Sequence, residues 1–217
     1  MGSPSKLAKA FQRVLARIGR EAPLRGFYLA GGNAIGAYFG HRTSEDLDLF
    51  SLDDSIKLDS IRNQLKKAIP ELKFINRSDA VLKAELDGVP IDIVSYPYAP
   101  LERPKKGPAG FPIASLRDLA AMKVDAISSR GIRRDFWDLY EIIRHGLSLE
   151  QALVAYCKRF GREHSDLYHV IRSLTYFGDA EKAPEYPEGL TPRKWAAIKR
   201  FFEAEVPKLL LGIQVEP

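Results

Sequence analysis

The chain contains 217 residues, of which 45% are hydrophobic and 28% are charged, a composition that excludes an intrinsically disordered protein and allows one large or two small domains. The net charge of +5 permits contact with RNA or nucleotides without requiring it. The single cysteine, Cys157, excludes an intramolecular disulfide and a zinc cluster, and no uncharged run could span a bilayer, so we predict a cytoplasmic protein with no membrane partner.

The first half of the chain alternates between predicted helices and strands. Apolar residues recur at helical spacing from Ser5 to Gly19, with Ser5 as the helix cap. A short strand over residues 27–30 runs into Gly31-Gly32. The Asp87-Gly88 pair is a typical hairpin turn. The other elements expected here are helices over 33–39 and 53–69 and strands over 46–51, 72–75, 81–86 and 89–95.

Residues 97–112 separate two regions of different character. Their five prolines, together with Lys105-Lys106, predict a linker or a long surface loop. Beyond it we expect helices over 115–129, 133–144, 148–160, 165–177 and 191–205, with a polar connection over 178–189. We therefore divide the chain into an α/β domain (1–98), a linker or loop (99–112) and a mainly helical domain (113–217).

Two aspartates share one face of the strand predicted over 46–51. Asp46 and Asp48 are two residues apart, so their carboxylates project side by side and repel each other unless a cation lies between them. Hard oxygen ligands at this spacing suit Mg²⁺, and Mn²⁺ also fits. The pattern predicts a divalent metal site, although an Asp-x-Asp pair by itself is more often a solvated strand face.

A phosphate-binding pattern lies just upstream. A strand that ends in Gly31-Gly32 and opens a helix lets the backbone approach an anion closely, and the helix N-terminus supplies free N–H donors. Ser44 adds a hydroxyl donor within reach of the same anion. A Gly-Gly turn alone is common, but its combination with Ser-x-Asp-x-Asp on a new strand favours a functional site.

These residues carry a family resemblance. Gly31-Gly32 followed by Asp46-Leu47-Asp48 resembles the signature of the polymerase-β-like nucleotidyltransferases. The longer string GGNAIGAYFGHRTSEDLDLF is similar to the first motifs of the AbiEii/AbiGii-type nucleotidyltransferase toxins, which a neighbouring antitoxin restrains. The family has a small hydroxyl residue where this chain has Asn33, and Asn can still donate to a phosphate. The resemblance implies an α/β (α+β) nucleotidyltransferase domain with a small mixed sheet, followed by a mainly α-helical domain.

A third carboxylate is expected on an adjacent strand to complete the metal site. Asp92 lies in the run Val89 to Val94, which is otherwise suited to a buried strand, where a lone carboxylate is costly without a cation or strong donors. We predict that Asp92 joins Asp46 and Asp48 as a metal ligand. The alternative is a structural Asp that is hydrogen-bonded to backbone at a strand end.

Lys123 lies at the centre of an apolar helix face. On a helical wheel Leu116, Leu119 and Ile127 flank it, whereas Asp118 falls on the opposite face. A lysine in that position extends to solvent, meets an anion or forms a buried ion pair. If it meets an anion, Lys123→Met removes only the charge, and we expect folding stability to hold or rise.

The next predicted helix carries Arg134, Asp135 and Asp138. Arg134 and Asp138 are spaced as a helix-surface salt bridge. Lys123 followed by these residues also matches the later motifs of the toxin family. The resemblance implies that Lys123 and Asp138 take part in catalysis and complete the nucleotide site.

The predicted function is Mg²⁺-dependent nucleotidyl transfer. Asp46, Asp48 and Asp92 would hold the metal, while a nucleoside triphosphate (NTP) would contact the side chains and backbone of Gly31, Gly32, Asn33, Arg42, Ser44 and Lys123. The resemblance implies an RNA (tRNA) or protein hydroxyl as acceptor and a cognate antitoxin as partner. Two alternatives stay open: transfer to a small molecule such as an aminoglycoside, and a non-catalytic module that binds RNA or a partner.

Overall fold

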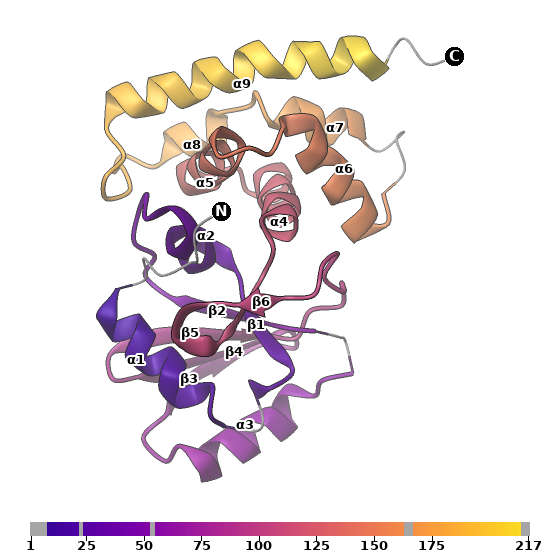
Figure 1. The fold of residues 1–217 in the computed structure, drawn as a ribbon. Helices are drawn as coiled ribbons and strands as arrows, with labels where there is room; N and C mark the ends of the chain where they lie inside the picture. The colour runs from indigo at the N-terminus through magenta and orange to yellow at the C-terminus, as the bar shows by residue number, and fades with distance from the viewer. Residues whose placement is uncertain (1–7, 22–23, 53–54, 163–166, 214–217) are drawn as a thin grey trace. The chain divides into compact units, whose positions relative to one another are not determined.

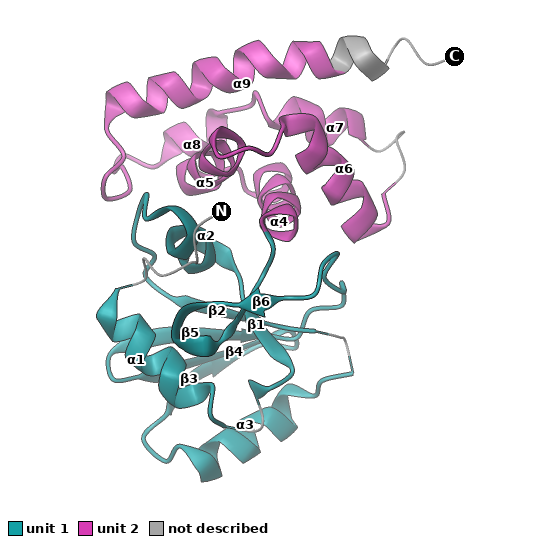
Figure 2. Cartoon of the chain, in the orientation of Figure 1, with its two compact units in different colours: residues 1–115 teal, residues 116–217 magenta. Residues whose placement is uncertain are grey.

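The computed structural model describes residues 8–21, 24–52, 55–162 and 167–213. The chain divides into two compact units, unit 1 (Met1–Ser115) and unit 2 (Leu116–Pro217) (Figure 2). The predicted helix cap Ser5, the helix start at Asp53-Asp54 and the helix start at Ser165 lie outside the described residues. None of the described helices is long and apolar enough to cross a membrane.

Unit 1 is built on a seven-stranded sheet with the strand order β3-β4-β5-β2-β1-β7-β6 (Figure 1). The strands are β1 (Phe27–Leu29), β2 (Leu47–Ser51), β3 (Lys73–Arg77), β4 (Val81–Leu86), β5 (Val89–Val94), β6 (Lys105–Lys106) and β7 (Pro112–Ile113). The pairs β2–β5 and β1–β7 are parallel, and the other neighbours are antiparallel. The mixed sheet that the sequence predicted is therefore confirmed.

Alternating burial explains why these segments form strands. On β2, Leu47 and Leu49 are fully buried while Asp48 between them is half-buried, and Ile91 and Ile93 on β5 enclose Asp92 in the same way. Each buried aliphatic side chain stabilises the fold by about 1.5–3 kcal/mol relative to exposure. The helices of this unit are α1 (Lys9–Ile18), α2 (Gly31–Phe39) and α3 (Leu58–Ala68). The apolar residues therefore fix which strand face carries the aspartates.

The proline-rich segment contributes to the sheet of unit 1. Residues 99–112 were expected to be a linker or loop, yet β6 and the start of β7 lie within them, and a short 3₁₀ turn, η2 (Pro108–Gly110), joins the two strands. Only one register pair, Leu29 with Ile113, ties β7 to β1. Strands of two residues carry no detectable periodicity, and β6 lies at the sheet edge with both lysines exposed, which is the place where proline-rich sequence is tolerated.

Unit 2 is entirely helical among its described residues. Its helices are α4 (Leu116–Ser129), α5 (Arg133–Arg144), α6 (Leu149–Phe160), α7 (Leu167–Ser173), α8 (Gly178–Lys182) and α9 (Pro192–Ile213). Helix α4 packs against α5, α6 and α7, and α9 crosses α5 and α7 (Figure 1). Phe136, Phe177, Trp195 and Phe202 form an aromatic core, with ring centroids 5.1–5.8 Å from Phe136.

Two expectations for unit 2 are corrected by its packing. Residues 178–182 form α8 rather than part of a polar connection, because Arg133 donates to the carbonyls of Ala183 and Glu185 and binds Glu181. Asp118, expected on the polar face of α4, is fully buried and paired with Arg159 of α6. The helical wheel correctly predicted one buried face of α4, but α6 also buries the face that carries Asp118.

Candidate active site

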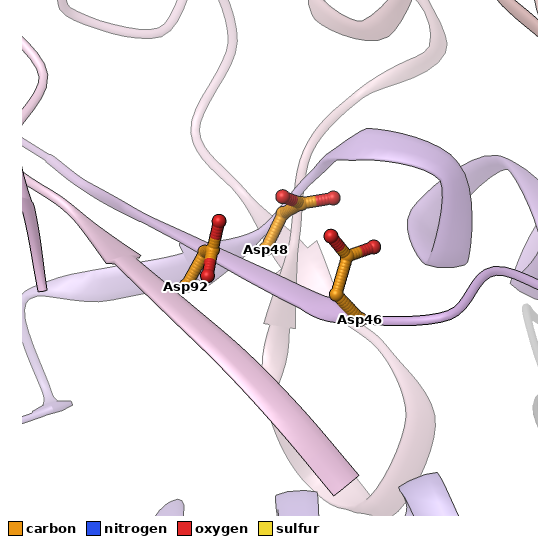
Figure 3. Close-up of side chains that lie close together, drawn as sticks. All are labelled: Asp46, Asp48 and Asp92. Carbon is orange, nitrogen blue, oxygen red and sulfur yellow. The ribbon is translucent and has the colours of Figure 1, made fainter. Parts of the chain in front are cut away.

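Three carboxylates gather on one side of two adjacent strands. Asp46 immediately precedes β2, Asp48 lies on β2 and Asp92 lies on β5, and each is half-buried. One oxygen from each of the three side chains lies within 4.8 Å of the others. Figure 3 shows the three side chains projecting to the same side of the strands. Three carboxylates this close repel one another unless a cation is bound, so this arrangement is suited to a divalent metal.

The parallel pairing of β2 and β5 brings Asp92 to the pair that the sequence placed on β2. Asp48 lies directly opposite Asp92 in the register, flanked by the pairs Leu47–Ile91 and Leu49–Ile93. Each strand has period 2, so a slip of one residue would move Asp92 to the other face of the sheet. The buried aliphatic neighbours therefore hold the carboxylates together.

Gly31 is required by the approach of Asp48. Its φ of +62° lies in the left-handed region, and a Cβ atom at this position would overlap the carboxylate of Asp48. The backbone amide of the preceding Ala30 donates to the carbonyl oxygen of Asp48 at 2.9 Å. The first turn of α2 is thereby fixed directly beside the carboxylate group.

Gly32 leaves room for two donors at the start of α2. A Cβ atom there would overlap the Arg42 guanidinium and would come 2.7 Å from the Ser44 hydroxyl oxygen. The Ser44 hydroxyl also donates to the Asp46 carboxylate at 3.2 Å. A helix N-terminus, a guanidinium and a hydroxyl in one place make a binding site for an anionic group such as phosphate.

Asn33 has a structural partner within this site. Asn33 is 3% exposed, and its side-chain amide donates to the backbone carbonyl of Asp46. Asn33 therefore ties the start of α2 to the residue that begins the aspartate motif. Contact between Asn33 and a phosphate stays a prediction.

Lys83 is a member of this cluster that the sequence analysis missed. It lies opposite Asp92 in the β4–β5 register, and its Nζ donates to Asp92 Oδ2 at 2.8 Å. This hydrogen bond, with the charges of Asp92, Asp46 and Asp48, raises the pKa of Lys83 against the opposing effect of burial. Counting back from the predicted Asp87-Gly88 turn would have placed Lys83 opposite Asp92.

The second group of predicted residues lies in unit 2. Lys123 of α4 is 6% exposed, and its Nζ lies 2.9 Å from Asp135 Oδ1 and 2.8 Å from Asp138 Oδ2, both on α5. Of the three outcomes that the sequence left open for this lysine, the structure shows the buried ion pair. Asp138, for which the sequence suggested a helix-surface salt bridge to Arg134, is also buried, and it pairs with Lys123.

The charges around Asp135 outweigh its burial. Burial alone would raise the pKa of this carboxyl, but Lys123 and Arg130 hold the pKa below its usual value. Arg130 contributes a bidentate pair, with Nε 2.9 Å from Oδ2 and Nη2 3.0 Å from Oδ1. Asp135 is therefore ionised in the folded chain and binds two cations from α4 and the turn after it.

Comparison with known proteins identifies the family. Residues 13–88 and 77–211 match the family described as "Nucleotidyl transferase AbiEii toxin, Type IV TA system". The chain belongs to the AbiEii family. An uncharacterized protein of Aquifex aeolicus (strain VF5), aq_aa25, is 33% identical over 208 residues, which cover 94% of this chain and 98% of the relative. The family resemblance of the sequence motifs is thus confirmed over most of the chain.

Solved structures of other proteins share the fold of this AbiEii-family chain. MenT4, a nucleotidyltransferase toxin from Mycobacterium tuberculosis H37Rv, aligns with a TM-score of 0.53 and 15% identity, over 92% of this chain and 85% of its own. The antibiotic-resistance factor ANT(2'')-Ia aligns with a TM-score of 0.51 and 16% identity, over 74% of this chain and 96% of its own. At these identities the likeness shows the fold alone. Together with the family match, it supports a transferase enzyme with nucleotidyl transfer as its activity.

Proposed function

We propose that this enzyme moves a nucleoside monophosphate from an NTP to a hydroxyl of RNA or protein with the help of Mg²⁺, as the toxin of a toxin–antitoxin pair. The observation that carries the proposal is the register of β2 and β5. It sets Asp48 opposite Asp92, beside Asp46 and beside the glycine-opened N-terminus of α2. All three carboxylates are present, which favours an active enzyme over a non-catalytic module.

The donor set fits a divalent ion, because the three side chains offer hard carboxylate oxygens within 4.8 Å of one another. Asp46, Asp48 and Asp92 would hold Mg²⁺, with Mn²⁺ as a substitute. When bound, the ion supplies positive charge that orients the phosphates and neutralises the charge that develops on them. The backbone amides at the start of α2, the Ser44 hydroxyl and Arg42 would bind the triphosphate and orient it for attack by the acceptor hydroxyl.

The same proposal assigns roles to Lys123 and Asp138, and it rests on the family motifs. Lys123 would contribute positive charge toward the triphosphate, and Asp138 would hold the lysine in its productive orientation. The ion pair between them supports the second part of this assignment. A preorganised charge of this kind is typically worth about 10²–10³ in rate.

Labelled nucleotides test the function directly. The purified protein is incubated with each α-labelled NTP, Mg²⁺, and either total RNA or a protein lysate, and the product is then digested with nuclease or protease. We expect label to enter one acceptor class, to require the metal, and to disappear with Asp48→Asn. Label that enters neither RNA nor protein, but a small molecule, would move the activity to the small-molecule alternative.

Coupled binding gives a second measurement. Mg²⁺ and the NTP complete each other's coordination, so we expect the melting temperature to rise more with both than the separate effects add up to. Equal stabilisation by NTP in the presence of excess chelator would contradict the proposed coupling between metal and nucleotide.

A further inference from the structure

A lysine is placed against the carboxylate cluster of unit 1. Lys83 Nζ lies 2.8 Å from Asp92 Oδ2, while the Asp92 side chain is 18% exposed and the Lys83 side chain 53%. The negative charges of Asp46 and Asp48 also attract the ammonium. The Lys83 ammonium therefore lies at the margin of the three carboxylates and contacts an oxygen of the residue that would be the third metal ligand.

A second lysine of the same sheet shows what an ordinary cross-strand pair looks like here. Lys73 Nζ lies 3.7 Å from Glu85 Oε1, with side chains that are 78% and 36% exposed, and Glu85 is not part of the cluster. Exposed pairs of that kind contribute little to stability. Lys83 differs because its partner is less exposed and belongs to a group with excess negative charge.

We propose that Lys83 is a built-in counterion that competes with the metal ion for Asp92. In the metal-free protein its ammonium neutralises part of the charge on the cluster. A divalent ion that takes Asp92 as a ligand displaces the ammonium from that oxygen and is repelled by it. Lys83 thus weakens metal binding to the nucleotide-free enzyme. The inference rests on the proposed function, since it takes the three carboxylates to be the metal site.

The test is direct titration of Mn²⁺, without nucleotide, into the full-length wild type, Lys83→Met and Lys83→Arg, with free Mn²⁺ followed by electron paramagnetic resonance. Lys83→Met should bind Mn²⁺ roughly tenfold more tightly. This factor corresponds to the repulsion energy that is removed, that between a unit charge and a divalent ion about 5 Å apart in water. Lys83→Arg keeps the charge and should stay within about twofold of the wild type. Lys73→Met is the matched control for loss of one lysine from the sheet and should also stay within about twofold.

Two results overturn the inference. Unchanged affinity in Lys83→Met shows that the ammonium does not oppose the metal ion, and weaker binding shows that it only positions Asp92. Circular dichroism with saturating Mn²⁺ establishes that each variant is folded. Asp48→Asn should abolish the binding, which assigns the Mn²⁺ to the carboxylate cluster. If the wild type and Lys83→Met both bind no Mn²⁺, the proposed metal site itself fails, a result distinct from normal Mn²⁺ binding that does not respond to Lys83.

Discussion

Unit 1 and unit 2 each contain a cluster of carboxylates and a lysine, and the two clusters are built in opposite ways. In unit 1, three half-buried carboxylates have Lys83 at their margin and Arg42 at the start of α2, so negative charge is in excess. In unit 2, Lys123 is 8% exposed along its side chain and lies between two fully buried carboxylates, with Arg130 as a second cation. An excess of negative charge at a partly exposed site favours binding of a cation, whereas balanced charges at a buried site hold helices together.

The most severe test of this comparison is Asp48→Asn. Transfer should fall by about 10³-fold, because one proposed metal ligand and one negative charge are lost from the cluster. The free energy of unfolding of the metal-free protein should not fall, because repulsion between neighbouring carboxylates decreases at the same time. Rates with labelled NTP and denaturant titration measure the two effects.

Asp59→Asn is the matched control, because Asp59 lies on α3 and pairs with Arg77 at the surface. It should leave the transfer rate unchanged. Wild-type transfer by Asp48→Asn would remove the functional meaning of the excess charge in unit 1.

Lys123→Met should have the largest effect on stability. It leaves Asp138 and Asp135 buried with one cation fewer, and breaking such a pair costs about 3–5 kcal/mol of unfolding free energy. The sequence alone led us to expect that stability would hold or rise, and the two carboxylates reverse that expectation. Denaturant titration measures the loss.

A double variant separates charge from packing at the same place. Lys123→Met combined with Asp138→Asn removes opposite charges together and should recover part of the lost stability. Lys199→Met, at an exposed pair with Glu181, should cost under about 1 kcal/mol. If Lys123→Met is as stable as the wild type, the matched cluster does not hold the helices together.

Gly31→Ala tests the close approach at the open cluster. An alanine in the left-handed region costs about 1–2 kcal/mol, and here its Cβ also overlaps the Asp48 carboxylate. Gly88→Ala is the matched control, since Gly88 has a φ of +76° and no atom within 4 Å of the added Cβ. We expect Gly31→Ala to lose more stability than Gly88→Ala, and to weaken Mn²⁺ binding. Equal losses with unchanged Mn²⁺ binding would show that Asp48 adapts freely.

The smallest expected effect is a pH dependence in unit 2. Glu181 binds Lys199, Trp195 and Arg133, and these contacts lower its pKa from 4.5 to about 2. A lowered carboxyl pKa stabilises the fold above the unfolded value, so this contribution is complete above about pH 5 and is lost as the pH falls from 4.5 to about 2.

The side chain of Glu181 is 41% exposed, so its contribution should be under about 1 kcal/mol. Glu181→Gln should flatten the fall in unfolding free energy across that window, measured by denaturant titration at several pH values. Glu203→Gln, on the same unit, serves as the control. An unchanged pH profile in Glu181→Gln would assign the acid sensitivity to the buried carboxylates alone.

The local patterns of the sequence predicted the parts of the site that depend on neighbouring residues. Period 2 placed Asp46 and Asp48 on one face, and the glycine pair marked the start of α2. The mixed sheet and the helical second half also followed from periodicity and family resemblance. Asp92 was expected on a neighbouring strand, and the structure brings it beside the other two carboxylates.

Other features depend on contacts that no single segment reveals. The burial of Asp118 follows from α6 covering the second face of α4, and β6 and β7 are too short to have a period. The sequence could not decide whether Lys123 meets solvent, an anion or a buried carboxylate. The answer, a pair of buried carboxylates, depends on how α4 packs against α5. Lys83 is an intermediate case. Its position opposite Asp92 could be predicted from the hairpin turn, but its proximity to all three carboxylates could be recognised only in the folded structure.

The parallel pairing of β2 with β5 also sets when the site can exist during synthesis. Asp46 and Asp48 are made early, but Asp92 is made only after α3, β3 and β4. A chain that stops before residue 89 carries two of the three carboxylates and lacks the strand that brings the third. If the three carboxylates hold the metal ion, as proposed, an unfinished chain should lack transfer activity until the strand after the hairpin has joined the sheet.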